Sequence, residues 1–208
     1  MARPRWAALA VLATMTLAAC TAGGKAPTTA KGQVEQTTSP TVRVKAARSS
    51  QELSRALAIT VPDGYVRQPD NVDDTGPSDL DKAVSDDGGN DARDIFTRDH
   101  FVRGYQREWV RDGGKDEIVS YVYQFADNAG AVDYTNRVAA DAGAPAGQFT
   151  VPDIAGAVGV NGSDPNFATS SVTFVKGPYS VQVVVNGASP DGLSALVTSV
   201  AEEQYSRL

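Results

Sequence analysis

Residues 101–125 read FVRGYQREWVRDGGKDEIVSYVYQF, and this stretch decides the fold. Large apolar residues alternate with arginine along 101–111, and apolar residues alternate again along 117–125, which is the two-residue period of a β-strand. The Asp112-Gly113-Gly114 segment between them is typical of a hairpin turn, because glycine readily adopts the positive φ that tight turns require. The sequence therefore predicts an antiparallel hairpin whose second strand has apolar residues on both faces.

The same pattern occurs a second time towards the C-terminus. After the first hairpin, Asp127 or Asn128 is a suitable N-cap for a helix that extends to Ala142. Strands are again predicted at 167–175 and 179–185, and a last helix is predicted at 191–207, after a favourable Ser189-Pro190 start. Each half of this region is therefore a strand-turn-strand-helix unit.

These two units, 101–142 and 167–207, predict an α+β fold. We expect their hairpins to merge into one antiparallel sheet, with the helices packed mainly on one face. Whether the two units arose by duplication stays open. Before them, the sequence indicates a short helix at 51–58, a short strand near residue 66 and a long acidic connection over 70–94 that contains further helical turns. A single domain over 51–208 is the simplest assignment for this length.

The N-terminus has the features of an export signal. Arg3 and Arg5 precede an uncharged run of 14 residues, from Trp6 to Ala19. A run of this length is too short to span a bilayer comfortably, which takes about 20 residues. It ends in Leu17-Ala18-Ala19-Cys20, and Cys20 is the only cysteine of the chain.

The sequence 17–20 resembles the lipobox of bacterial lipoproteins. This resemblance implies that residues 1–19 are a signal peptide, that a type II signal peptidase cuts before Cys20, and that Cys20 carries a diacylglyceryl group. It further implies acylation by palmitate-type chains and a location on the outer, extracytoplasmic face of the cell membrane. The alternative is an ordinary secretory signal followed by a chance cysteine. The Arg-Pro-Arg sequence does not support a twin-arginine signal.

Residues 20–50 are expected to form a flexible tether, because Thr, Ala, Gly, Ser and Pro dominate them and no aromatic residue occurs. Residues 21–50 hold five Lys and Arg and one Glu, a net charge of +4, whereas 51–208 hold 12 Lys and Arg and 24 Asp and Glu, a net charge of −12. The basic tether could lie near anionic lipid headgroups, but chance composition explains it equally well.

The composition excludes several classes of protein. A formal charge of −6 argues against a nucleic-acid partner, which requires a basic surface. One cysteine and one histidine exclude a disulfide scaffold, and they argue against haem or a zinc site with several Cys and His ligands. No cofactor or metal site is predicted.

Catalytic signals are weak. His100, the only histidine, could act as a base only beside a nucleophile, and a surface position is the more ordinary expectation. No Gly-x-Ser-x-Gly sequence occurs. The aspartates of 70–94 could hold a hard cation, although a solvated acidic loop is the simpler interpretation.

The first strand of the opening hairpin provides the candidate ligand-binding residues Arg103, Tyr105, Arg107 and Trp109. Because these residues share one strand face, which Phe101 should share too, they could form an aromatic and cationic surface for an anionic or carbohydrate ligand. The alternative is that the aromatic rings pack beneath helices, with the arginine stems lying over them.

The folded domain also loosely resembles small, uncharacterised actinobacterial lipoproteins. The points of similarity are Pro62–Tyr65, Gly104-Tyr105 followed by Arg107 and Trp109, Val151-Pro152, and the ending Glu203–Leu208. This resemblance implies no active site. The sequence therefore predicts a membrane-anchored, non-enzymatic binding or interaction domain, with an envelope protein or polymer as partner. The alternatives are an envelope hydrolase that uses acidic residues and a carrier of an apolar ligand.

Overall fold

The computed structural model describes residues 49–71, 75–141, 147–164 and 167–208. The predicted signal peptide, Cys20 and the tether up to residue 48 lie outside the described residues. Ser49 and Ser50 fall within the predicted tether but belong to the first helix, α1 (Ser50–Ala56). The Ser49 hydroxyl caps this helix by accepting a hydrogen bond from the Glu52 N–H at 3.3 Å.

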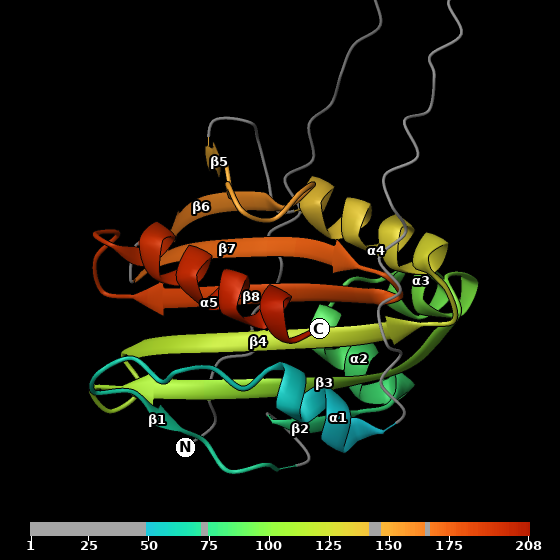
Figure 1. The fold of residues 1–208 in the computed structure, drawn as a ribbon, viewed down its shortest axis with the longest axis horizontal. Helices are drawn as coiled ribbons and strands as arrows, with labels where there is room; N and C mark the ends of the chain where they lie inside the picture. Colours follow the sequence, from blue (N-terminus) through green and yellow to red (C-terminus); the bar gives the residue numbers. More distant parts are fainter. Residues whose placement is uncertain (1–48, 72–74, 142–146, 165–166) are drawn as a thin grey trace, which may run out of the picture. The chain divides into compact units, whose positions relative to one another are not determined.

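One antiparallel sheet of eight strands forms the centre of the described domain (Figure 1). The two predicted hairpins lie in its middle and pair with each other through β4 and β8, in the order β1-β3-β4-β8-β7-β6-β5, while β2 also pairs with β3. The strands are β1 (Val66–Arg67), β2 (Gly76–Ser78), β3 (Phe101–Arg111), β4 (Asp116–Phe125), β5 (Gln148–Phe149), β6 (Val158–Asp164), β7 (Phe167–Lys176) and β8 (Tyr179–Gly187). The predicted α+β fold with one antiparallel sheet is confirmed.

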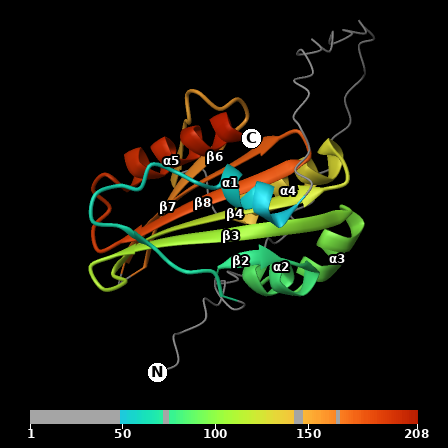
Figure 2. The same cartoon turned by 60° about the horizontal axis from the view of Figure 1, so that its bottom comes forward.

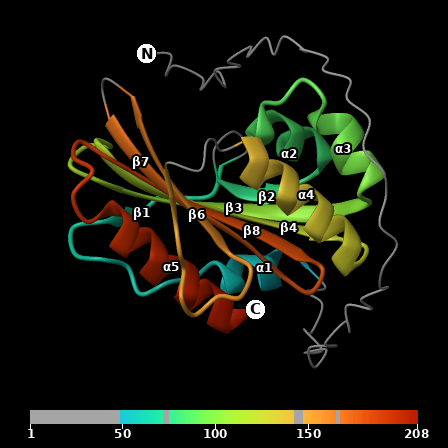
Figure 3. The same cartoon turned by 90° about the horizontal axis from the view of Figure 1, so that it is seen from above.

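Helices cover both faces of this sheet. They are α1, α2 (Leu80–Asp87), α3 (Ala92–Arg98), α4 (Asn128–Asp141) and α5 (Leu193–Arg207). Seen along the sheet, α1 and α5 lie on one side, and α2, α3 and α4 lie on the other (Figure 3). We call these sides the α5 face and the α4 face.

The expectation that the helices pack mainly on one face is therefore wrong. The reason lies in β4, where Ile118 and Val122 belong to the core of the α5 face, while Tyr123 and Phe125 belong to the core of the α4 face. Since successive side chains of a strand point to opposite faces, a strand that is apolar on both faces needs cover on both. The helices of the two units, α4 and α5, take opposite faces.

The core of the α5 face is mostly aliphatic. Val181, Val183 and Val185 of β8 are fully buried beneath Val197 of α5, whose side chain is also fully buried. Burial of one such side chain stabilises the fold by about 1.5–3 kcal/mol. Gln204 is a fully buried polar residue of this layer, and its Nε2 donates to the Leu57 carbonyl at 3.3 Å and to the Ser120 hydroxyl at 2.8 Å.

The core of the α4 face is aromatic. Phe96 of α3 lies at its centre, with ring centroids 4.7 Å from Tyr134 and 5.2 Å from Tyr123. Phe101, which should share a face with Tyr105, joins this cluster instead. The pairing of β3 with β4 shifts register between Phe101 and Arg103, and this irregularity turns the Phe101 ring towards Phe96, at 5.1 Å.

Two local predictions also need correction. The acidic connection contains the short strand β2, which sequence pattern did not indicate, and the next residue, Asp79, caps α2 by accepting from the Lys82 N–H at 2.9 Å. The last helix begins at Leu193 rather than at residue 191, because Gly192 has a φ of 77° that does not fit a helix. The hairpin turn is as expected, with positive φ at Asp112, Gly113 and Gly114.

Candidate functional site

The predicted ligand-binding residues of β3 all lie on the α5 face, but they differ in exposure. Tyr105 and Trp109 belong to the core, with 3% and 1% of their surface exposed. Their rings are therefore not available for stacking on a ligand from solvent. The arrangement agrees with the alternative in which these rings pack beneath a helix.

The arginines of the same strand remain within reach of solvent. Arg103 and Arg107 are both half-buried. The Arg107 Nη2 donates to the Ser54 hydroxyl of α1 at 2.5 Å. Its Nε is buried and makes no hydrogen bond to any described residue. Arg107 is thus a cation held under the first helix, and no carboxylate of a described residue hydrogen-bonds to it.

The strand pairing along the outer edge of β3 is interrupted beside Arg107. Arg67 of β1 pairs with Trp109, and the described pairing resumes where Gly76 of β2 meets Gln106. Figure 2 shows β2 beside β3. Between these points the chain leaves the edge after Gln68, whose N–H still donates to the Glu108 carbonyl at 2.9 Å. The departing chain carries Asp70, whose side chain is 44% exposed.

Asp70 connects three side chains near this interruption. It accepts a hydrogen bond from the Tyr105 hydroxyl and forms an ion pair with Arg67, whose Nη2 lies 2.6 Å from its Oδ1. Arg67 and Arg107 are diagonal neighbours on the α5 face, because Arg67 faces Trp109 directly. We call Ser54, Arg67, Asp70, Tyr105 and Arg107 the Arg107 cluster.

The titration behaviour of the cluster follows from its geometry. Burial lowers the pKa of Arg107, and the neighbouring charge of Arg67 lowers it further. Burial also raises the pKa of Tyr105, as does the bond to Asp70, while Ser54 acts in the opposite direction. The cluster therefore has two guanidinium groups and one carboxylate, with a neutral phenol between them. Its net charge is +1, in a domain of net charge −12.

Sequence reasoning found two members of this cluster and missed Ser54, Arg67 and Asp70. Ser54 lies 53 residues before Arg107, and Asp70 lies 35 residues before Tyr105. Packing of α1 on β3 brings Ser54 to Arg107, and the edge pairing of β1 with β3 brings Arg67 and Asp70 beside it. The three-residue spacing of Arg67 and Asp70 was a possible signal for their ion pair, but it does not indicate the other partners.

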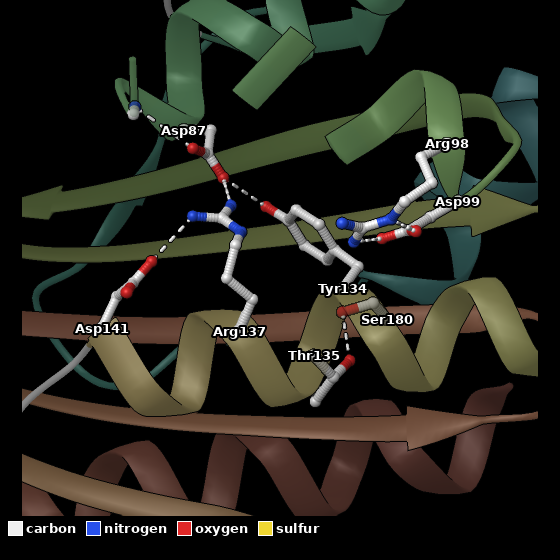
Figure 4. A network of polar contacts seen from close by, with 9 residues as sticks. Asp87, Arg98, Asp99, Tyr134, Thr135, Arg137, Asp141 and Ser180 are labelled. Atoms are coloured by element: carbon white, nitrogen blue, oxygen red, sulfur yellow. Dashed lines mark hydrogen bonds and ion pairs between the residues drawn. The ribbon is translucent and has the colours of Figure 1, made fainter. Parts of the chain in front are cut away.

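A second polar network lies on the α4 face (Figure 4). The Asp87 carboxylate, only 5% exposed, accepts hydrogen bonds from the Tyr134 hydroxyl at 3.0 Å and from the Arg137 guanidinium, and it also accepts from the Gly89 N–H at 3.2 Å. Arg137 donates in turn to Asp141 at 2.8 Å. This network joins the end of α2 to α4, and its Arg137 Nε, like that of Arg107, makes no hydrogen bond to a described residue.

The remaining predicted features do not assemble into a site. His100 is exposed, and its φ of 57° serves the turn from α3 into β3. Among the residues that the structure describes, no group of three or more His, Cys, Asp or Glu side chains is placed to hold a metal ion. Within the same ranges, no helix has the length and apolar character to cross a membrane.

Comparisons with known proteins add little. No protein-family model matches the chain, and no curated protein matches it. Among solved structures, the fold is similar to the extracellular domain of PknH from Mycobacterium tuberculosis, with 8% sequence identity and a TM-score of 0.46. The match covers 77% of this chain and 97% of that domain. At this level, the similarity supports no statement about function or location.

Proposed function

We propose that this protein is a membrane-anchored lipoprotein whose folded domain acts outside the cytoplasm as a binding domain of the cell envelope. The observation that carries the proposal is the N-terminal sequence, in which two arginines, an uncharged run of 14 residues and Leu17-Ala18-Ala19-Cys20 occur in the order that type II signal peptidase requires. Two acyl chains on one cysteine would make a stable anchor, whereas a single chain binds a membrane only marginally.

The binding role is supported by the Arg107 cluster. A half-buried arginine without a carboxylate bound to it is costly to maintain, because its desolvation is not repaid by an ion pair within the described structure. Such a group is typical of a site that completes its interactions with a ligand. The tether of 20–50, with an r.m.s. reach of about 30 Å if flexible, would leave the domain free to reach an envelope partner.

The anchoring part is tested with Cys20→Ala in the full chain, expressed in a bacterial host. The parent should incorporate labelled palmitate, partition with membranes and lose residues 1–19, as read from the mass of the purified protein. The variant should incorporate no label, because the thiol that receives the diacylglyceryl group is gone. Thr21→Ala is the matched control, since it changes the neighbouring residue and keeps the thiol. Unchanged labelling and mass in Cys20→Ala would overturn the proposal.

The binding part is tested by crosslinking the anchored protein in its native envelope and isolating what it contacts. The parent and Arg107→Gln should be compared at equal expression. A partner that is retained by the parent and lost with Arg107→Gln supports a binding role for this face. Equal recovery of the partner by the parent and by Arg107→Gln would show that the Arg107 cluster does not bind it, and would contradict this part of the proposal.

A further inference from the structure

The Arg107 cluster has the geometry of an oxyanion site. Its two guanidinium groups come from different strands, with Arg67 on β1 and Arg107 on β3, and their side chains are diagonal neighbours across the interrupted edge. Arg67 is 42% exposed and Arg107 is half-buried. The cluster therefore reaches from the surface towards the core, and an incoming group would meet both cations.

The hydrogen bonds within the cluster leave donors unused. Asp70 occupies the Arg67 Nη2 and the Tyr105 hydroxyl, while the Ser54 hydroxyl occupies the Arg107 Nη2. A guanidinium has five N–H donors, and among the described residues only the Ser54 hydroxyl accepts from Arg107. The five residues of the cluster carry a net charge of +1, whereas Asp87, Arg137 and Asp141 of the second network carry −1.

We propose that the Arg107 cluster binds a phosphate-type oxyanion through Arg107, Arg67 and the Ser54 hydroxyl. A planar carboxylate matches the fork of a single arginine. A tetrahedral phosphate presents oxygens in several directions, so it can accept from two forks and a hydroxyl that do not share one plane. This assignment rests on the proposed binding role and gives its ligand a chemical class. The group could belong to a free phosphate or to a phospholipid head group, since both present the same oxygens.

The test uses the mature chain purified in a neutral detergent, with inorganic phosphate as the probe. Thermal unfolding is measured while phosphate replaces chloride at constant ionic strength, because a ligand that binds the folded state raises the midpoint. The phosphate-dependent rise should be larger for the parent than for Arg67→Gln and Arg107→Gln. The apparent affinity should fall roughly tenfold in each variant, the expected effect of losing one charged hydrogen bond.

Arg93→Gln is the matched control, because it removes the same charge from an exposed ion pair with Asp81 away from the cluster. It should respond to phosphate like the parent. Phosphate also stabilises proteins in general, and this effect is common to the parent and all the variants. The test therefore compares the phosphate-dependent rise in the unfolding midpoint between the parent and each variant. If Arg107→Gln does not fold, the exposed Arg67→Gln still decides. An equal response of Arg67→Gln and the parent would overturn the proposal.

The two sources of the group are separated in nanodiscs. In phosphatidylcholine discs, added phosphate should raise the midpoint of the parent. If an anionic head group is the natural occupant, discs containing phosphatidylglycerol should abolish that rise in the parent and leave Arg67→Gln indifferent to the lipid. If free phosphate is the occupant, the rise should be the same in both discs. These readings do not depend on where the cell places the protein, so failure here differs from failure of the Cys20 experiment.

Discussion

Replacement of Gly130 by alanine should destabilise the domain, although alanine is the better helix former. Gly130 lies in the first turn of α4, and a Cβ built on it would be 2.1 Å from the Asp99 carbonyl oxygen. Carbon and oxygen atoms need more than 3 Å, so the backbone of α4 or of the α3–β3 junction must move by about 1 Å. Both segments are fixed by the aromatic core, in which Phe96 stacks on Tyr134.

The expected magnitude follows from two opposing contributions. Overpacking of a well-packed site costs about 1–3 kcal/mol, and here the obstacle is backbone rather than a movable side chain. Alanine in a helix gains about 1 kcal/mol over glycine. Because a backbone clash falls at or beyond the upper end of the overpacking range, we expect a net loss of roughly 2 kcal/mol in the free energy of unfolding.

The assay is urea unfolding of the mature chain, followed by the fluorescence of Trp109, which is 1% exposed in the folded state. Ala129→Gly is the matched control, because Ala129 is the exposed neighbour in the same helical turn. It should lose about 1 kcal/mol through helix propensity alone. If propensity governed both positions, Gly130→Ala would gain what Ala129→Gly loses. An increase in the unfolding midpoint of Gly130→Ala would therefore refute the close approach of α4 to Asp99.

Other expected outcomes concern α5 and the α4 face. Glu203→Ala should cost about 1–2 kcal/mol and Glu202→Ala less than about 0.5, because Glu203 accepts the Thr60 N–H at 2.8 Å; urea midpoints of the two variants provide the comparison. Burial acts to raise the pKa of Glu203, but the hydrogen bonds from Arg207 and Thr60 outweigh burial, so the pKa lies below its usual value of 4.5. The stability that the carboxylate contributes should therefore be lost as the pH falls below about 5. Glu203→Gln should not show this loss. Tyr134→Phe should cost about 1–2 kcal/mol in urea by removing a donor from buried Asp87. Burial and the charge of Asp87 raise the pKa of Tyr134 well above 10.0, so alkaline titration should show its ionisation only with unfolding, and stability should fall as the pH rises above about 10.

Sequence pattern predicted the elements of this fold better than their packing. The alternation along 101–125 and 167–185 placed both hairpins, because side chains of a strand point to opposite faces whatever lies around it. The assignment of helices to faces failed, since the apolar residues on both faces of β4 require cover but do not say which helix supplies it. The face of Phe101 was also missed, because a one-residue irregularity has no signature in the pattern.

In the candidate site too, sequence pattern predicted residues on one strand but not the contacts between distant segments. Arg103 and Arg107 of β3 were recognisable by their type and spacing, but the burial of Tyr105 and Trp109 depends on α1, which lies about 50 residues away in sequence. Ser54 and Asp70 could not be found from local pattern, since a serine in a helix and an aspartate in an acidic loop are ordinary on their own. Their role comes from contact with Arg107 and Tyr105, which only the folded chain establishes.

The short strands at the two edges of the sheet bear on self-association. A long edge strand presents a row of unpaired N–H and C=O groups that can recruit another chain. Here β5 has two residues, β1 has two and β2 has three, and the chain leaves the edge between β1 and β2. The 11-residue strand β3 is thereby shielded by short pieces that cannot template a continuous ladder. The interruption beside Arg107 therefore also leaves the β3 side of the sheet without a continuous edge onto which a neighbouring copy could add a strand.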